Sequence, residues 1–380
     1  MKKLFSTLFA ASAIMLCAAP DDAQVYRATT RHIDFNGEQI VYYNCTELGQ
    51  LINKLPGVIE KISAFDESGR LKPAAAAAEM ILKAMNLNAL RASAFSQKEL
   101  KSDLFIYKES YYLGKAAALP GIFSTAGQNN DLSLQAALAS MPADLIFASQ
   151  FQLMPGKFYQ HIDDTIKNSK HEQIKTLCNV MCQNSKIDVT RLLNSANGLY
   201  TMVLAGDSED TFRFSLTIPD NDGSISAELK KLLPPDPKNP NRSIIPLPSK
   251  KKREYLKPEV VYLDKEIILV SSFERCVAKI HRPYALRADF VQQLPANGAA
   301  FSVLNITPKT LESLKRLCKD KPVILTLLNT INPASGAEVI KIAPDGVYTV
   351  GVADFSFSAA YFNFSQKLAT IIDEAKALKK

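Results

Sequence analysis

The sequence predicts an α+β protein in which antiparallel sheets are covered by helices on one side, with an internal duplication. Two observations predict this class. Short runs of alternating polar and apolar residues are separated by stretches with helical spacing, and similar strand–turn–helix segments occur twice in the chain. The composition agrees, because 47% hydrophobic and 22% charged residues are typical of a globular protein. A chain of 380 residues has room for two or three domains of ordinary size.

Residues 1–19 have the layout of a secretory signal peptide. Lys2 and Lys3 precede an apolar run that ends at Cys17 and is too short to span a bilayer permanently. Cleavage near Ala18 therefore predicts a periplasmic or secreted protein. The alternative is a lipid anchor at Cys17, although Leu16 stands where lipoprotein processing prefers a small residue.

Residues 24–130 are expected to form an N-terminal hairpin and helix region. The alternation over residues 25–44 predicts a β-hairpin that turns at Asn36-Gly37, since Asn-Gly favours a tight turn with positive φ. The elements expected after it are helices over residues 48–62 and 73–85, strands over 89–95 and 103–113, and a helical segment that ends near residue 123.

Residues 131–233 and 259–380 are predicted to be two related strand–helix modules. Residues 141–151 and 294–304 each place a Pro-Ala-Asp or Pro-Ala-Asn turn before an apolar strand, and GLYTMVLAG (198–206) closely resembles GVYTVGVAD (346–354). The helices expected in the modules cover residues 156–167, 171–194, 225–233, 307–319 and 366–378. Further strands are expected at residues 211–218, 322–330, 337–342 and 355–364.

A proline-rich, basic segment, residues 234–258, separates the two modules. It holds seven prolines among 25 residues and is expected to be an extended surface linker or loop, because proline cannot join the interior of a sheet. The second module then begins with a hairpin over residues 260–272 that turns at Asp264-Lys265, followed by a helix over residues 273–280.

A four-residue turn motif occurs at the start of both modules. It and its surroundings are MPAD (141–144), LPAN (294–297), the paired-strand stretch at 87–114 and the hairpin at 260–272. On these residues the chain resembles a family of uncharacterised exported bacterial proteins built from repeated strand–helix modules that open on an L-P-A-D turn. The resemblance covers residues 85–380, with Met141 and Asn297 as departures from the motif. It implies an architecture and an exported location, and no activity.

The cysteines allow, but do not define, a disulfide pattern. Once Cys17 is removed with the signal peptide, the remaining cysteines are Cys45, Cys178, Cys182, Cys276 and Cys318. An odd number leaves at least one thiol free. Cys178 and Cys182 share a helical face, where they can bridge to each other, bridge to a neighbouring element or be small buried apolar residues. The sequence leaves these alternatives open.

No metal site or cofactor site is predicted. His161 and Asp164 share a helical face next to Asp163, but a solvated helix surface explains them. Asp220-Asn221-Asp222-Gly223 resembles a calcium loop, yet Ile218 occupies the first ligand position, which excludes an EF-hand. A turn followed by a helix cap at Asp222 or Ser224 accounts for these residues.

No catalytic residue is predicted either. His171-Glu172 begins a metalloprotease helix motif, but Lys175 occupies the position of the second histidine. Ser249 and Lys252 form an S-x-x-K pair in the proline-rich linker, where nothing rigid would lower the pKa of the lysine. The two other histidines, His32 and His281, have no partners in the sequence.

These observations favour a non-enzymatic exported protein that binds a partner or has a structural role. The partner is not identified; a protein or a lipid of the cell envelope, or a second copy of the chain, fits an exported protein. A nucleic-acid partner is not expected, because the net charge of +7 is mild for this length and the cluster Lys250–Arg253 lies in the linker. The alternatives are a periplasmic carrier with an open apolar sheet face and a hydrolase whose residues converge from distant positions.

Overall fold

The structure is a computed structural model of the chain. It describes residues 20–46, 54, 57–58, 61, 89–114, 130–168, 176, 187–208, 211–246, 258–271, 283–321, 324–325, 328–329 and 332–356. The predicted signal peptide, the basic cluster Lys250–Arg253 and the predicted helices at 73–85, 273–280 and 366–378 lie outside these residues.

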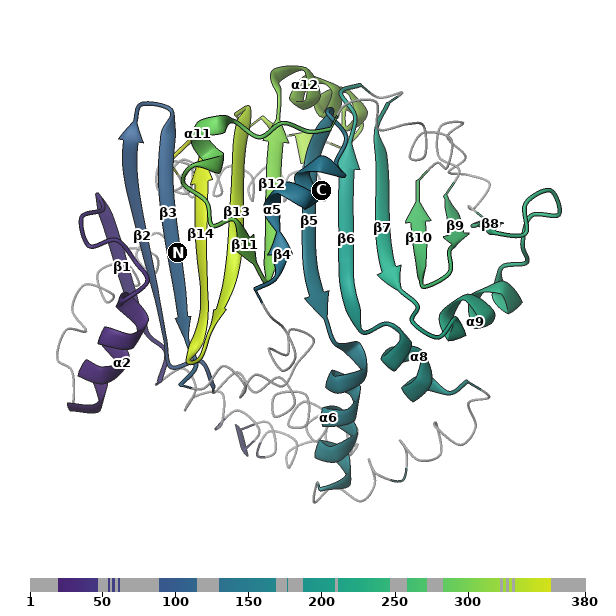
Figure 1. Ribbon diagram of the computed structural model, residues 1–380, viewed down its shortest axis with the longest axis horizontal. Coiled ribbons are helices and arrows are strands. Elements are labelled where there is room, and N and C mark those ends of the chain that lie inside the picture. Colours follow the sequence, from purple (N-terminus) through teal and green to yellow (C-terminus); the bar gives the residue numbers. More distant parts are fainter. Residues whose placement is uncertain are drawn as a thin grey trace.

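One 12-stranded antiparallel sheet dominates the described part of the chain (Figure 1). Its strands are, in chain order, β1 (Gln39–Asn44), β2 (Ala92–Lys101), β3 (Leu104–Tyr112), β5 (Leu145–Leu153), β6 (Gly198–Ala205), β7 (Arg213–Pro219), β8 (Arg242–Ile244), β9 (Glu259–Tyr262), β10 (Glu266–Val270), β12 (Ala300–Ile306), β13 (Ala334–Ala343) and β14 (Gly346–Ala353). The order across the sheet is β1-β2-β3-β14-β13-β12-β5-β6-β7-β10-β9-β8. The predicted antiparallel α+β class is therefore confirmed, but the N-terminal region and both predicted modules share a single sheet.

The middle of the sheet is the pair formed by β5 and β12, in which Ser149 lies opposite Ser302. On one side of this pair lie β13 and β14, and on the other lie β6 and β7. The hairpin β2–β3 does not pair with β5, the next strand of this sheet along the chain. It pairs through β3 with β14, whereas the hairpin β9–β10 pairs through β10 with β7.

Helices contact both faces of the sheet. The helices with described bounds are α2 (Pro20–Thr30), α5 (Leu134–Ala139), α6 (Pro155–Lys167), α8 (Val189–Ser195), α9 (Ser224–Leu232), α11 (Ala288–Val291) and α12 (Pro308–Leu317). Phe290 of α11 and Leu138 of α5 belong to one buried apolar cluster with Phe301 of β12. A second cluster joins Ile225 of α9 to Ile267 of β10. The strand register places Ile268 on the same face as Phe301, so Ile267 and this second cluster lie on the opposite face.

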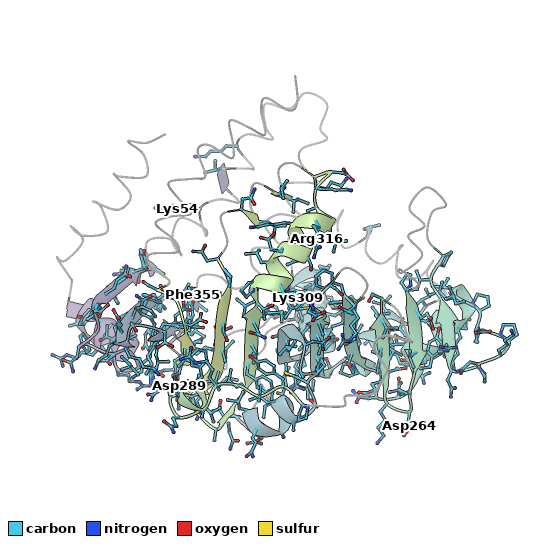
Figure 2. All side chains as sticks on the ribbon, turned by 90° about the horizontal axis from the view of Figure 1, so that it is seen from above. Lys54, Asp264, Asp289, Lys309, Arg316 and Phe355 are labelled. Carbon is cyan, nitrogen blue, oxygen red and sulfur yellow. The ribbon has the colours of Figure 1, made fainter. Side chains whose placement is uncertain are left out.

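Figure 2 shows the same two-sided arrangement along the sheet. Asp289 of α11 lies on one side, and Lys309 and Arg316 of α12 lie on the other. A short two-stranded ladder of β4 (Leu132–Ser133) and β11 (Asn297–Gly298) accompanies α5 and α11. The sequence predicted helices on one side, so the two-sided contact is a difference from that expectation.

The predicted N-terminal hairpin over residues 25–44 is wrong in its first half. Residues 20–30 form α2, and only Gln39–Asn44 form a strand. The hydroxyls of Thr29 and Thr30 donate hydrogen bonds to the carbonyls of Val25 and Tyr26, one helical turn back. Alternation over a few residues fits one face of a short helix as well as a strand, so periodicity alone could not separate the two.

Two further expectations need correction. The segment 322–330 was predicted to be a strand, but its described residues include Ile324 and Leu325 in helical conformation. The proline-rich segment is not wholly a linker, because Arg242–Ile244 pair with β9 as the short edge strand β8. Its prolines do not interrupt this strand, in line with the confinement of proline to edges. In the strand predicted at 355–364, Phe355 and Ser356 are not in a strand, and the rest lies outside the described residues.

Most other predicted elements are confirmed within a few residues. These are the strands β2, β3, β5, β6, β7, β12, β13 and β14, the hairpin β9–β10, and the helices α6, α9 and α12. Of the helix predicted over residues 171–194, the described part is α8.

Candidate functional site

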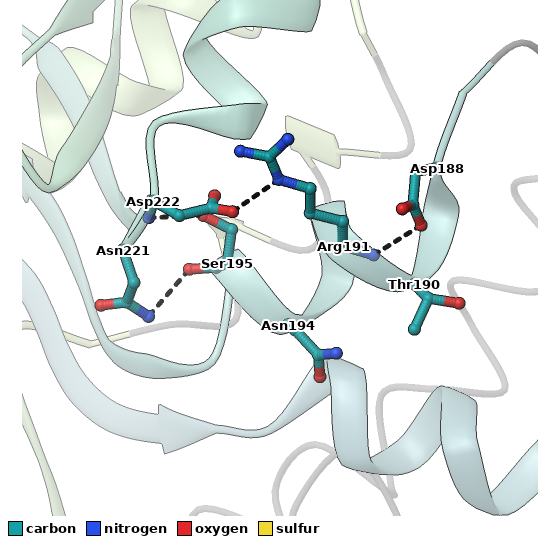
Figure 3. Close-up of a pocket in the computed structure, with 7 residues that line it drawn as sticks. All are labelled: Asp188, Thr190, Arg191, Asn194, Ser195, Asn221 and Asp222. Carbon is teal, nitrogen blue, oxygen red and sulfur yellow. Dashed lines mark hydrogen bonds and ion pairs between the residues drawn. The ribbon is translucent and has the colours of Figure 1, made fainter.

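A polar hollow of about 460 Å³ lies between α8 and the turn that joins β7 to α9 (Figure 3). Its lining residues are Asp188, Thr190, Arg191, Asn194, Ser195, Asn221 and Asp222. Its lining includes Asn221 and Asp222 of the Asp220–Gly223 segment, which the sequence predicts to be a turn before a helix. It brings together two hydroxyls, two carboxylates, a guanidinium and two amides from segments that are about 30 residues apart.

Asp220 fixes the start of α9. Its carboxylate oxygens accept hydrogen bonds from the backbone N–H groups of Ile225 (3.0 Å) and Ser226 (2.9 Å). Gly223 precedes α9 with φ 73°, a left-handed conformation that glycine adopts without strain. Asp222 accepts a further bond from the backbone N–H of Ser224 at 3.0 Å. The predicted turn and helix start are confirmed, but the main cap is Asp220, not Asp222 or Ser224.

The Ser195 hydroxyl forms hydrogen bonds with the same turn. It donates to the Asp220 carboxylate at 2.8 Å and accepts from the backbone N–H of Asp222 at 3.2 Å. Asn221 in turn donates to the backbone carbonyl of Ser195 at 2.9 Å. Burial alone would raise the pKa of Asp220, but the hydrogen bonds from Ser226, Ser195 and Ile225 outweigh it and lower that pKa. Ser195 therefore joins the end of α8 to the start of α9.

Each charged side chain of the hollow has a partner within it. Arg191 donates from Nε to the Asp222 carboxylate at 2.7 Å, and its backbone N–H bonds to Asp188 at 2.9 Å. The bond from Arg191, followed by those from Ser224 and Ser195, holds the pKa of Asp222 well below its usual range. A carboxylate held ionised beside a paired guanidinium is a poor proton acceptor at neutral pH. This geometry is that of a structural joint between two helices.

A second polar cluster lies on one face of the sheet, near its middle. The Tyr107 hydroxyl on β3 donates to Glu338 on β13 at 3.0 Å, across the intervening strand β14. On β3 the Tyr111 hydroxyl donates to Glu109 at 2.9 Å. By register, Glu338 also lies opposite Ser302. A row of polar side chains thus crosses the strands β3, β13 and β12 on a single face.

Burial controls the ionisation of this second cluster. It raises the pKa of the Glu338 carboxyl, and the nearby Glu109 carboxylate raises it further, against the opposing hydrogen bonds from Tyr107 and Ser302. Burial and the neighbouring Glu338 raise the pKa of the Tyr107 hydroxyl well above its usual range. Tyr107 is therefore a hydrogen-bond donor and not a base at any physiological pH.

The histidines singled out in the sequence are not brought together. His161 lies on α6 with Nε2 buried, whereas Asp163 on the same helix pairs with Lys167. His32 follows α2 and stacks on Tyr348, a tertiary contact that no local pattern predicts. Within the described part of the chain, no group of three or more His, Cys, Asp or Glu side chains is placed to hold a metal ion. Outside the described residues lie His171, Glu172, Lys175, Ser249, Lys252 and His281.

Of the five cysteines that follow the signal peptide, two lie in the described residues. Cys45 is buried at the end of β1, Cys318 is half-buried at the end of α12, and both are free thiols. Burial raises the pKa of Cys45, which makes its thiol less reactive. Cys178, Cys182 and Cys276 lie outside the described residues.

Comparison with protein-family models, with curated proteins and with solved structures finds no match to this chain. Among the described residues, no helix has the length and apolar character needed to cross a membrane.

Proposed function

We propose that the chain is an exported, non-enzymatic binding or structural protein that contacts a macromolecular partner at the β1 end of its sheet. The observation that carries this proposal is the exposure of apolar side chains there. Phe35, Ile40 and Tyr43 are 55%, 40% and 49% exposed, and Tyr26 of α2 is 37% exposed. Large apolar side chains gathered on a protein surface are typical of a protein interface.

The two ends of the sheet differ in a way that supports this choice. Strand β1 has the sequence QIVYYN, and none of its six residues is buried or charged. At the other end β8 has three residues and includes Arg242, with Pro240 and Pro246 close by. Charge, proline and short length are the usual means by which proteins protect the edge of a sheet from association. β8 has these features and β1 does not.

The polar hollow argues against a hydrolase. The Ser195 hydroxyl donates a hydrogen bond to Asp220, and Arg191 forms an ion pair with Asp222. A nucleophilic serine needs a neighbouring base that can accept its proton at neutral pH, and the pKa of Asp220 is lowered, which is the wrong direction for that role. A lipid carrier with an apolar sheet face fits less well, because Glu109, Glu338 and Tyr107 occupy the middle of one face.

We further propose that the signal peptide is removed near Ala18 and that the mature protein is periplasmic or secreted. α2 begins at Pro20, immediately after the proposed cleavage site, so cleavage would leave the described fold complete. Lipidation at Cys17 is the alternative. Intact mass of the exported protein separates the two, because a lipid anchor adds the mass of its acyl chains to a chain that begins with Cys17.

An internal duplication is supported by the middle of the sheet. Ser149 and Ser302 lie opposite each other with their hydroxyl oxygens 3.1 Å apart, and they are 153 positions apart in the chain. The same spacing relates Pro155 and Pro308, the first residues of α6 and α12. It also relates the turns that begin at Met141 and Leu294. We propose that the two halves of the sheet arose from one repeated unit and are related by an approximate two-fold axis between these serines.

This duplication pairs the strands differently from the sequence comparison. Counted outward from the middle, β6 corresponds to β13 and β7 to β14, so residues 198–206 and 346–354 are not in equivalent positions. In the same count, the hairpin β2–β3 corresponds to β9–β10. Each hairpin then completes the half-sheet of the other repeat.

Site-specific photo-crosslinking in the native host tests the proposed binding role. A photo-reactive phenylalanine analogue at position 43 is expected to give a discrete adduct on illumination. The matched control is the same analogue at Ile244, which is 59% exposed at the opposite edge and is expected to give none. Absence of an adduct from both positions 43 and 40 would contradict the proposal. A hydrolytic activity of the purified protein that Ser195→Ala abolishes would contradict its non-enzymatic part.

A further inference from the structure

The turn after α2 is joined to the turn between β13 and β14 by a cluster around His32. Arg31 donates from Nε to Nε2 of His32 at 2.9 Å, and the Arg31 guanidinium forms an ion pair with Asp345. The His32 ring stacks on Tyr348 of β14, with ring centroids 4.2 Å apart and planes only 3° from parallel. These contacts connect the segment that carries α2 and β1 to a turn more than 300 positions away in the chain.

The hydrogen bond between Arg31 and His32 requires a neutral imidazole. Nε2 can accept from Arg31 only when it carries no proton, because a protonated imidazole is a donor at both nitrogens. Stacking on Tyr348 fixes the plane of the ring and so keeps Nε2 directed at Arg31. A proton on Nε2 would remove the hydrogen bond that His32 accepts from Arg31. It would also place the imidazolium in contact with the Arg31 guanidinium, so that two cations would repel each other.

The charged groups around His32 do not favour the protonated form on balance. Burial lowers the pKa of His32 below its ordinary value of 6.5, Arg31 lowers it further, and Asp345 acts in the opposite direction. Asp345 is engaged by the Arg31 guanidinium and is only partly available to compensate a second cation. Tyr348 contacts the imidazole through the face of its ring.

We propose that Arg31, His32, Asp345 and Tyr348 form a pH-sensitive latch, which holds the turn after α2 against the β13–β14 turn and opens when His32 is protonated. This inference goes beyond the proposed binding function and does not depend on any partner. It couples acidification to the end of the sheet that exposes Phe35 and Ile40. The sign is fixed: the latch contributes fully above about pH 6.5 and its contribution is lost as the pH falls below that value.

Hydrogen exchange of the full chain, compared at equal pH between the wild type and His32→Gln, tests the latch. The Gln amide oxygen accepts from Arg31 but takes up no proton. The quantity compared is the ratio of the exchange rate in the wild type to that in the variant, for the amides of residues 27–37. This ratio is expected to rise about tenfold when the pH is lowered from about 8 to about 5, as loss of one charge-assisted hydrogen bond predicts. Comparison at equal pH cancels the chemical pH dependence of exchange.

His161→Gln is the matched control, because His161 lies on α6 and has no part in the cluster. It is expected to behave as the wild type at every pH. A wild-type to His32→Gln ratio that stays constant over this range overturns the proposal, as does an equal effect of His161→Gln. If His32→Gln fails to fold, NMR titration of the wild-type imidazole decides: a pKa at or above 6.5 for His32 contradicts the latch.

Discussion

On the β1 side of the middle pair, the Tyr107 ring of β3 lies across the backbone of Gly351 to reach Glu338. A Cβ at position 351 would stand 1.9 Å from Cζ of Tyr107, closer than any real contact. Gly351 therefore supplies the space for a hydrogen bond between β3 and β13, two strands that are not neighbours in the sheet. Here the requirement for glycine comes from packing and not from backbone conformation.

Substitution of Gly351 by alanine is expected to destabilise the protein by about 1–3 kcal/mol, because the Tyr107 ring has to leave its position or strain the strand. Urea unfolding monitored by far-ultraviolet circular dichroism measures the change. Gly57→Ala is the matched control, since an added methyl there meets nothing within 4 Å. Equal free energies of unfolding for the wild type and Gly351→Ala would show that the site is not tightly packed.

Glu338 predicts a pH dependence of stability with an unusual sign for a carboxyl. Its pKa in the folded protein is raised above the ordinary value of 4.5, so ionisation costs free energy only in the folded state. The contribution of Glu338 is therefore favourable below that ordinary pKa and declines as the pH rises through the raised value. Glu338→Gln keeps an acceptor for Tyr107 and is expected to raise the free energy of unfolding at neutral pH, with a difference that vanishes in acid. A loss of stability at neutral pH would contradict this assignment.

At the level of elements, the start of α9 depends on one buried side chain. Asp220 is 1% exposed and satisfies two backbone N–H groups of α9 together with the Ser195 hydroxyl. The helix has nine residues, too few to be stable without caps and packing. Ile225 and Leu229 on its inner face contact the cluster that contains Val260.

Asp220→Ala is expected to lower the free energy of unfolding by about 2 kcal/mol, because it removes the helix cap and leaves the Ser195 hydroxyl without its acceptor. Asp264→Ala, an exposed aspartate in the β9–β10 turn, serves as the control and should be neutral. Thermal unfolding followed by circular dichroism measures both. If both variants melt at the same temperature, Asp220 is not the cap that stabilises α9.

The elements themselves were largely predictable, because each depends on local pattern. Alternation around Asp264-Lys265 predicts the β9–β10 hairpin, and α6 and α12 begin at prolines after apolar strands. α2 was missed because the threonine hydroxyls that bond within the helix leave no periodic apolar signal. Residues 322–330 were missed for a related reason: a short apolar run fits a strand and a buried helix equally.

At the scale of the whole molecule, the pairing of strands was beyond the reach of local pattern. Nothing in the residues of β3 indicates β14 as its neighbour, and a link such as that between Tyr107 and Glu338 depends on the completed sheet. In the candidate site, too, local pattern predicts the turn but not the contacts between distant segments. The turn at Asp220–Gly223 was readable from its residue types, whereas its partner Ser195 and the stacking of His32 on Tyr348 are tertiary facts.

Because the β2–β3 hairpin pairs with β14 and the β9–β10 hairpin pairs with β7 in one continuous sheet, we expect the described body to unfold in one transition. Val260 on β9 and Val352 on β14 lie on opposite sides of the middle pair and are both fully buried. Val260→Ala and Val352→Ala should each shift the same single urea transition, by about 2 kcal/mol. Tyrosine fluorescence and circular dichroism should coincide throughout. Two separate transitions, each shifted by one variant only, would show that the halves are independent.

The placement of β3 beside β14 also has a consequence in time. Tyr107 and Glu338 are 231 positions apart, so β3 is synthesised long before β14, the strand that completes its pairing. Contacts between such distant segments make folding slow, since a long loop must close before any contact forms. The β2–β3 hairpin can pair within itself early, but the edge of β3 that pairs with β14 stays open while the intervening chain is made. For the exported protein that we propose, such a delay would keep the chain unfolded for its passage through a membrane, and mutations that speed this pairing are expected to slow export.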